Sequence, residues 1–336
     1  MKITASERAA LLALMANFSR QRVLLLGDLV ADEYIYGEIA RVSREAPVLI
    51  LKQREKQVVP GGGANAANNL TELGAQVIPF GVLGHDESGD ALAGYFREKQ
   101  VSLRHVLRLR GYQTPTKSRI LGGLTHWQRQ QIVRVDREPA QKLAPEIRQR
   151  LTKSVVPLMR GSSALLISDY GYGSTDAREV EFLRRRAGRG FPITLDSRYA
   201  LLTYKRLTAA TPNEPEVEAA FGESIGNHLD RLHHLGRKLL RRQALDALLI
   251  TRGRDGMALF EPRREPRLLP IFASDQAVDV TGAGDTVIAA FTLALAARGS
   301  PLQAAMLANC AAGLVVMKRG TATVRAKELA EAIRNA

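Results

Sequence analysis

Short apolar runs alternate with helical segments along most of the chain, and this alternation restricts the fold more than any other feature. The clearest apolar runs are 23–26, 75–82, 164–168, 193–195 and 248–251. Segments with helical spacing lie between them, at 64–73, 90–99, 140–159 and 227–243. Such runs are typical of strands buried on both faces, because helices cover both sides of a parallel sheet. We therefore predict an α/β fold with a doubly wound, mostly parallel sheet flanked by helices.

Two stretches, 34–59 and 114–135, interrupt this alternation. Both contain β-prone residues, and neither contains a long helical pattern. We predict that together they form a small β-sheet lid, inserted in a single domain that spans residues 1–336. The sequence has no internal repeat or low-complexity linker that would divide the chain further.

The chain is strongly basic, with 48 Lys and Arg against 34 Asp and Glu and a net charge of +14. Nucleic-acid binding is one explanation, because phosphate contacts dominate that affinity. However, the basic clusters are scattered, only one Trp is present, and no nucleic-acid motif accompanies them. We therefore expect no nucleic-acid partner, and the charge suits a small substrate that carries phosphate.

No stretch approaches the roughly 18 consecutive apolar residues that a membrane span needs. The first 22 residues lack the apolar block and cleavage site of a signal peptide. The single cysteine, Cys310, lies in an apolar helical run and excludes an intrachain disulfide. We expect no membrane association and a cytoplasmic location.

The strongest chemical motif is Asp-Val-Thr-Gly-Ala-Gly-Asp at 279–285, followed by a long apolar helical run. The backbone N–H groups of Gly282, Ala283 and Gly284 could form an anion hole at the start of that helix. Asp285, in its first turn, could accept a proton from an attacking hydroxyl during phosphoryl transfer. The alternative is that Thr281 caps the helix, the glycines form a turn, and Asp285 interacts favourably with the positive end of the helix dipole.

A second motif, Pro-Gly-Gly-Gly-Ala-Asn at 60–65, precedes a helix of small residues. Gly62 and Gly63 would let a substrate lie against the backbone, and Asn65 offers both a donor and an acceptor to hydroxyl groups. A flexible turn that leads into a tightly packed helix is an equally good explanation. Other functional motifs are absent from the sequence. It has no His and Cys spacing typical of a metal site, no G-x-S-x-G nucleophile motif and no G-x-x-x-x-G-K-[ST] phosphate-binding loop.

These two motifs, in this order and about 220 residues apart, resemble the ribokinase or PfkB family of carbohydrate kinases. The resemblance covers roughly residues 20–325 and implies a ribokinase-like fold, with ATP as phosphoryl donor and Asp285 as general base. It places Asp32 on sugar hydroxyls. On the nucleotide side, the residues implied are Asn213, Thr251, Gly253, Gly256, Thr281 and Asn309.

The same resemblance implies two cations. Relatives organise Mg²⁺ and phosphate through an N-x-x-E element, which is matched here by Asn213 to Glu216. Glu216 and Asp279 are accordingly the expected metal residues. A monovalent cation, K⁺, is implied near Asp279 and the segment 318–321.

Within the family, the closest resemblance is to D-glycero-β-D-manno-heptose 7-phosphate kinases. The residues that show this resemblance include Gly27-Asp28 with Asp32, the runs 34–37, 43–48 and 60–62, and Asp169-Tyr170. The implied reaction phosphorylates the anomeric hydroxyl of a heptose 7-phosphate and gives a heptose 1,7-bisphosphate, a lipopolysaccharide precursor. Asp169 would contact the sugar, and the candidates for its phosphate are Arg44, Lys117, Arg119 and Arg198.

Three positions depart from that subfamily's pattern, namely Glu33, Tyr172 and Ser197. A kinase of another sugar or of a nucleoside therefore remains an alternative, as does a non-catalytic sugar-binding module. We also expect a homodimer, because the exposed edges and apolar face of a small lid sheet favour pairing between subunits.

Overall fold

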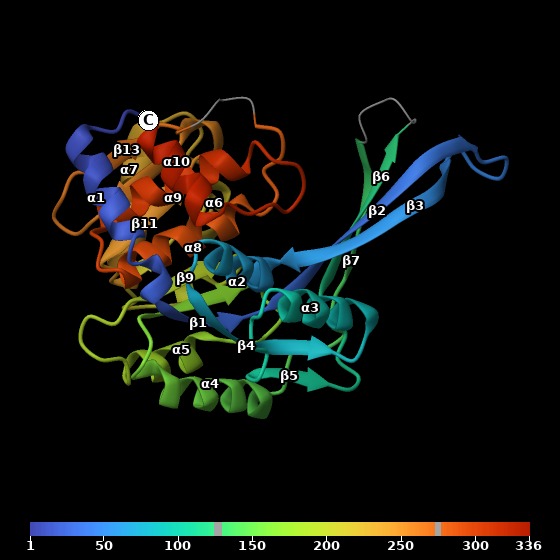
Figure 1. Ribbon diagram of the computed structural model, residues 1–336, viewed down its shortest axis with the longest axis horizontal. Helices are drawn as coiled ribbons and strands as arrows, with labels where there is room; N and C mark the ends of the chain where they lie inside the picture. The colour runs from blue at the N-terminus through green and yellow to red at the C-terminus, as the bar shows by residue number, and fades with distance from the viewer. Residues whose placement is uncertain (124–129, 273–276) are drawn as a thin grey trace.

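The computed structural model describes residues 1–123, 130–272 and 277–336, and its centre is a nine-stranded sheet (Figure 1). The strand order is β13-β12-β11-β10-β9-β8-β1-β4-β5. All neighbours from β11 to β5 pair in parallel, whereas β12 and β13 pair antiparallel at one edge. The strands are β1 (Arg22–Gly27), β4 (Gln76–Gly84), β5 (Val106–Leu109), β8 (Ala164–Asp169), β9 (Ile193–Ser197), β10 (Ala209–Ala210), β11 (Ala247–Thr251), β12 (Met257–Phe260) and β13 (Arg267–Leu269).

Helices cover both faces of this sheet and form two separate cores. On one face lie α1 (Ala5–Met15), α2 (Gly62–Glu72), α3 (Glu87–Glu98), α8 (Ala283–Ala296), α9 (Pro301–Val315) and α10 (Ala326–Arg334). On the other lie α4 (Pro145–Met159), α5 (Ala177–Arg184), α6 (Glu214–Phe221) and α7 (Leu229–Gln243). In β1, Val23 and Leu25 join the first core, whereas Leu24 and Leu26 join the second. Because side chains alternate along a strand, a continuous apolar run fills both cores.

The predicted doubly wound sheet is therefore confirmed, and each of the five apolar runs is a strand. The four helical segments are also helices, although α4 begins five residues later than the pattern predicted, at Pro145. The short strands β5, β10, β12 and β13 were not predicted, because two to four residues are too few to show a period.

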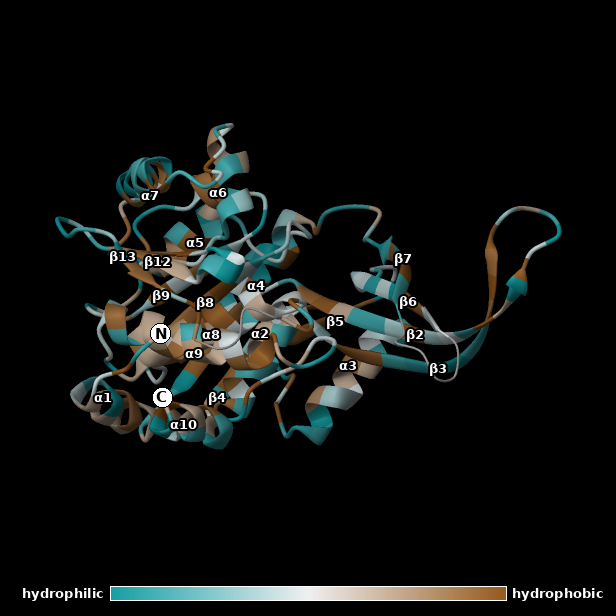
Figure 2. Cartoon of the chain, turned by 90° about the horizontal axis from the view of Figure 1, so that it is seen from above, coloured by the Kyte–Doolittle hydropathy of each residue, from teal (hydrophilic) through white to brown (hydrophobic). Residues whose placement is uncertain are grey.

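The two irregular stretches form a second sheet of four strands in the order β3-β2-β6-β7. These strands are β2 (Leu29–Val42), β3 (Leu49–Gly61), β6 (Thr116–Gly123) and β7 (Gln130–Arg137). Residues 124–129 of the predicted lid lie outside the described residues. The sheet projects from the main body (Figure 1), and we call it the lid. Figure 2 shows apolar residues in the centre of the body and again at the far tip of β2 and β3.

Within the described ranges, no helix combines the length and apolar character needed to cross a membrane.

Candidate active site

The glycine-rich motif forms the turn that begins α8. Gly282 is the N-cap, with φ 78° and ψ 4°, a left-handed conformation that favours glycine. A Cβ at Gly282 would also lie 2.7 Å from Nδ2 of Asn65. Gly284 differs, because no heavy atom lies within 4 Å of the place its Cβ would take. The chain's own packing does not require glycine at 284, so that backbone is open to the close approach of a ligand.

The start of α8 presents free backbone donors, as the motif predicted. Among the described residues, no backbone bond uses the N–H of Gly282, Gly284 or Asp285. The structure differs at Ala283, whose N–H donates to the carbonyl of Val280 at 3.2 Å. The backbone N–H groups of Gly282, Gly284 and Asp285 are therefore available to an anion, at the positive end of the helix dipole.

Asp285 is 4% exposed and receives two hydrogen bonds from distant parts of the chain. Asn65 Nδ2 donates to Oδ2 at 2.8 Å, and the Tyr170 hydroxyl donates to Oδ1 at 2.7 Å. Burial raises the pKa of Asp285 to about 7, although both hydrogen bonds act in the opposite direction. A carboxylate with that pKa can accept and release a proton near neutral pH, as a general base must.

A chain of buried polar groups fixes the orientation of the Asn65 amide. Thr286 Oγ1 donates to Asn69 Oδ1 at 2.9 Å, and Asn69 Nδ2 donates to Asn65 Oδ1 at 3.1 Å. Because the Asn65 carbonyl accepts from Asn69, its amide nitrogen faces Asp285. Asn65 and Asn69 are four residues apart on α2 and therefore share one face of the helix.

Tyr170 reaches Asp285 from the loop after β8, which is held by the buried carboxylate of Asp28. Asp28 accepts the backbone N–H groups of Tyr170 at 2.9 Å, Tyr172 at 3.0 Å and Ser174 at 2.9 Å. The strand-ending Gly-Asp pair of the first apolar run thus positions a loop more than 140 residues away in sequence.

The lid brings Asp32 to the same site. Asp32 Oδ1 accepts from Arg119 Nη1 at 2.7 Å, and Oδ2 accepts from Thr321 Oγ1 at 2.8 Å. The Tyr34 hydroxyl also accepts the Thr321 backbone N–H at 2.9 Å. Arg119 is therefore the ion-pair partner of Asp32, which gives it a structural duty in addition to the phosphate contact that was predicted.

Lys117 lies on the same face of the lid, because it pairs with Asp32 across β2 and β6. Its Nζ is 5.3 Å from the centre of the Tyr170 ring and has no hydrogen bond or ion pair with any described residue. Burial and the nearby charge of Arg198 lower the pKa of Lys117. Lys117 and Arg198 thus place two positive charges beside the carboxylates of Asp32, Asp196 and Asp285.

Asp169 and Arg44 were assigned to the sugar side, and the structure shows different contacts for Asp169 and a distant location for Arg44. Asp169 accepts from Gly171 N–H at 3.0 Å, Ser197 Oγ at 3.0 Å and the Tyr204 hydroxyl at 2.7 Å, so both its oxygens are used within the protein. These bonds show that Asp169 supports the loops after β8 and β9, and its contact with the sugar stays a prediction.

Arg44 lies in the hairpin between β2 and β3, beyond Val42. The strand from Asp32 to Val42 spans about 33 Å at 3.3 Å per residue. The structure therefore does not bring Arg44 to the site of its own chain.

Glu33, one of the departures from the subfamily pattern, faces away from the site. Successive strand residues point to opposite faces, and Asp32 occupies the inner one. Glu33 bonds to Ser118 Oγ, Lys56 Nζ at 2.9 Å and Arg137 Nη2 at 3.3 Å on the outer face. Glu33 therefore contributes to the structure of the lid and does not line the site.

A cavity of about 170 Å³ adjoins the glycine turn at the start of α8. It brings together four of the residues predicted for the nucleotide side, Thr251, Gly253, Gly256 and Asn309, with Ala283 and Gly284. The rest of the lining is mainly apolar and includes Met257, Ile271, Val287, Ala312 and Val316. Asn309 itself donates to the carbonyl of Pro270 at 2.8 Å, which holds the segment after β13 against α9.

The residues predicted for cations serve as caps in this structure. Asn213 and Glu216 form a capping box at the start of α6, and burial raises the pKa of Glu216. Asp279 accepts the N–H groups of Thr281 and Gly320, each at 2.9 Å, so the turn at 318–321 packs against it as expected. In the described part of the chain, no three His, Cys, Asp or Glu side chains form a group that could hold a metal.

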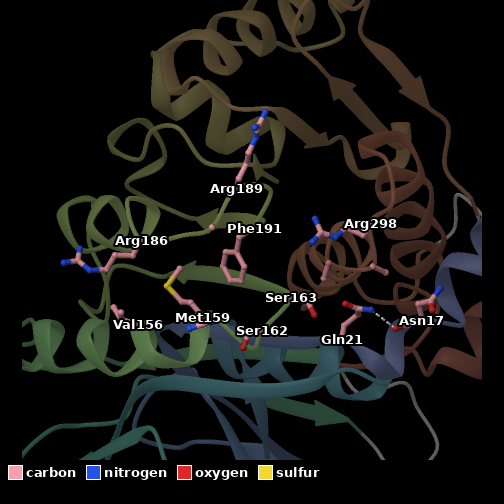
Figure 3. Close-up of a pocket in the computed structure, with 14 residues that line it drawn as sticks. Asn17, Gln21, Val156, Met159, Ser162, Ser163, Arg186, Arg189, Phe191 and Arg298 are labelled. Carbon is pink, nitrogen blue, oxygen red and sulfur yellow. Dashed lines mark hydrogen bonds between the residues drawn. The ribbon is translucent and has the colours of Figure 1, made fainter.

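Another cavity, of about 850 Å³, is elsewhere (Figure 3). It lies at the amino ends of β1, β8 and β9, opposite the strand ends that carry the site. Figure 3 shows Phe191 near its centre, with Arg186, Arg189 and Arg298 around it. The adjacent helices α1, α4, α5 and α8 all end here, and arginines commonly bond to the carbonyls of helix ends. None of the predicted site residues lines this cavity.

Sequence reasoning missed Tyr170, Asp28, Asn69 and Asp196 as site residues. The spacing of Asn65 and Asn69 was a usable signal, because it places both amides on one helix face. Asp196 ends β9, and burial together with the nearby carboxylates of Asp285 and Glu216 raises its pKa well above the usual value. Only the fold reveals that these acids converge.

Comparison with known proteins agrees with this geometry. The model of the pfkB family carbohydrate kinases matches residues 21–328. "Bifunctional protein HldE" of Desulfatibacillum aliphaticivorans is 39% identical over 318 residues, which are 93% of this chain and 63% of that protein. The protein of the same name from Magnetococcus marinus is 36% identical over 330 residues, 96% of this chain and 66% of that protein. The chain thus spans slightly less than two thirds of the length of these relatives.

Two solved structures share the fold at low identity. Arabidopsis thaliana ribokinase, complexed with ribose and ATP, has a TM-score of 0.73 and 21% identity, and the match covers 94% of this chain and 98% of that one. Phosphofructokinase-2 from Escherichia coli, in complex with potassium, has a TM-score of 0.75 and 16% identity with the same coverage. The ribokinase-like fold is therefore confirmed, and the chain belongs to the pfkB family of carbohydrate kinases.

Proposed function

We propose that this protein transfers the terminal phosphoryl group of ATP to a sugar hydroxyl, with Asp285 as the general base. One observation carries the proposal: Asp285 lies between two differently built compartments. On one side are the hydrogen-bonding groups of Asn65 and Tyr170 under the lid. On the other is the mainly apolar cavity beside Gly284, which suits an aromatic base with its phosphates at the helix start.

In this arrangement the chain's residues position the reactants and stabilise charge. Asn65 and Asp285 would contact the acceptor hydroxyl, and Asp285 would take its proton as the new bond to phosphorus forms. The free N–H groups of Gly282 and Gly284 would receive the negative charge of the phosphoryl oxygens. The lid would reduce the access of water.

Mg²⁺ fits the acids at this edge, although they do not form a closed cage. Mg²⁺ usually keeps several waters and binds through one or two carboxylates together with substrate phosphates. Glu216 and Asp196 are the carboxylates suited to that contact, and the ion would neutralise phosphate charge. A monovalent cation would lie beside Asp279 and the turn at 318–321.

For the acceptor, we propose a sugar already phosphorylated at its far end, with heptose 7-phosphate first and the anomeric hydroxyl as target. Lys117 and Arg198 support this choice, because they place two positive charges under the lid on the sugar side. The resemblance to heptose 7-phosphate kinases leads to the same substrate. A kinase of an unphosphorylated sugar or a nucleoside remains the alternative.

The test is a kinase assay with ATP, Mg²⁺ and K⁺ and a panel of acceptors: heptose 7-phosphate, ribose, fructose, fructose 6-phosphate and adenosine. We expect the sugar phosphates to be preferred. Asp285→Asn should lower kcat by about 10²–10⁴-fold, which is the usual contribution of a general base. Nucleotide affinity, measured by calorimetry, should be nearly unchanged.

Asp246→Asn is the control, because Asp246 is an exposed aspartate that precedes β11 at the opposite end of the sheet. It should retain wild-type kcat. Near-normal turnover of Asp285→Asn would refute the base assignment. Binding without turnover of any acceptor in the wild type would instead indicate a non-catalytic sugar-binding module.

A further inference from the structure

Tyr170 is the residue closest to the chemistry that neither the motifs nor the comparisons assign. Its hydroxyl donates to Oδ1 of Asp285 at 2.7 Å, and its backbone N–H is bonded to Asp28 at 2.9 Å. A Cβ at Gly62 would lie 3.2 Å from Cε2 of the tyrosine, so the glycine leaves room for the ring. Lys117 Nζ lies over the ring at 5.3 Å. The side chain is therefore held on several sides.

We propose that Tyr170 is a positioning residue for Asp285, which orients its carboxylate plane and favours its ionised form. The inference rests on the proposed function, because it assumes that Asp285 is the base. Two donors bonded to two different oxygens, Tyr170 to Oδ1 and Asn65 to Oδ2, fix the rotation of the carboxylate. Each oxygen keeps a second lone pair that can accept the substrate hydroxyl.

Tyr170 acts as a donor and does not itself serve as a base. Burial and the adjacent Asp285 raise the pKa of Tyr170 well above its usual value, so the hydroxyl keeps its proton over the working range. Burial alone would favour the protonated, inactive form of Asp285, and the bonds from Tyr170 and Asn65 oppose that effect. Loss of one bond should therefore leave less active carboxylate at neutral pH.

Other charged groups face Asp285 and must be considered in a pH experiment. Asp32 on the lid raises the pKa of Asp285, and Lys117 lowers it. Asp196 at the end of β9 interacts with Asp285, and Arg198 lies near Tyr170. None of these groups is altered by removal of the Tyr170 hydroxyl, so a matched variant isolates its contribution.

The test is Tyr170→Phe, which keeps the ring and removes the donor. We expect the midpoint of the acid limb of kcat/KM against pH to move to higher pH by about one unit, the size of one hydrogen bond to a charged group. At pH 7 kcat should fall several-fold, and the loss should diminish at pH 9. The KM for ATP should stay unchanged.

Tyr204→Phe is the control, because the Tyr204 hydroxyl also donates to a buried carboxylate, Asp169, at 2.7 Å. It should alter thermal stability as much as Tyr170→Phe does, without moving the acid limb. If Tyr170→Phe does not fold, 3-fluorotyrosine at position 170 offers the opposite change: a stronger donor should move the midpoint to lower pH.

An unchanged acid limb in folded Tyr170→Phe, or in the fluorotyrosine protein, would overturn the inference. The outcome is separate from that of the proposed function, which fails if Asp285→Asn is active or if the wild type turns over no acceptor. If Asp285→Asn is inactive while Tyr170→Phe keeps the wild-type profile, the base assignment stands and the positioning role of Tyr170 falls.

Discussion

At the scale of single residues, the site holds the proposed base, Asp285, in an environment that opposes ionisation. Asp285 is 4% exposed, and burial raises its pKa from 3.8 to about 7. Asp196 shares this environment, since burial and the charge of Asp285 also raise its pKa. Such acids destabilise the fold when they ionise, and their retention fits a catalytic duty better than a structural one.

This cost should be visible in the stability of the protein. The pKa of Asp285 is higher in the folded chain than in the unfolded chain, so its stabilising contribution is full below about pH 4. It is lost as pH rises through about 7. The difference amounts to on the order of 4 kcal/mol for a shift of this size. We expect Asp285→Asn to gain in melting temperature relative to wild type as pH rises from 5 to 8. Parallel melting curves at all pH values would contradict this.

At the scale of elements, β2 separates two functions on its two faces. Its inner face carries Asp32 to the site, and its outer face carries Glu33 into the frame of the lid. Glu33 contacts all three other strands of the lid through Lys56, Ser118 and Arg137. Lys56 also bonds to Glu87 at the start of α3, at 2.7 Å. The buried carboxylate of Glu33 thus connects the four strands of the lid, and Lys56 connects the lid to α3 of the main body.

Glu33→Gln should loosen this frame. The change leaves Lys56 and Arg137 without their shared counter-charge, so we expect a loss of about 1–3 kcal/mol in the free energy of unfolding. The KM for the sugar should rise several-fold while the KM for ATP stays constant, because the proposed function places only the sugar under the lid. Urea denaturation and steady-state kinetics measure both effects.

Glu38→Gln is the matched control on the same strand. Glu38 pairs with Arg54 at 2.6 Å at the surface, and such solvated ion pairs contribute little to stability. Equal effects of the two substitutions would mean that Glu33 has no special role in the lid.

At the scale of the whole molecule, the lid has an uncovered apolar surface. Val133 and Val135 on β7 are 45% and 48% exposed, and Val42, Val48 and Leu49 are exposed near the tip of β2 and β3. β7 is also an edge strand with unpaired backbone groups. These features agree with the predicted homodimer, in which a second lid would cover this surface.

Sedimentation should give twice the chain mass of 36.8 kDa for the wild type. Val133→Lys with Val135→Glu should shift the protein to the monomer. Leu268→Glu, which changes a residue of similar exposure on β13 of the main sheet, should not. A wild-type monomer at micromolar concentration would contradict the prediction.

Much of the fold could be predicted because its signals are local. The strand runs are apolar on both faces, the caps are short motifs such as Asn213 with Glu216, and the glycine turn precedes an apolar helix. The site is less predictable, since it depends on contacts between distant residues. Tyr170 and Asp285 are 115 positions apart, and Asp32 and Thr321 are 289 apart.

The sequence by itself determined the doubly wound sheet, the glycine turn before α8 and the acid in the first turn of that helix. Periodicity and backbone sterics act within a few residues, so a single chain displays them directly. Only the tertiary structure decided which groups surround that acid. Strand register turned Lys117 toward the site and Glu33 away from it, and the length of β2 placed Arg44 far from it. Burial, which exists only once distant segments pack together, raised the pKa of Asp285 to about 7.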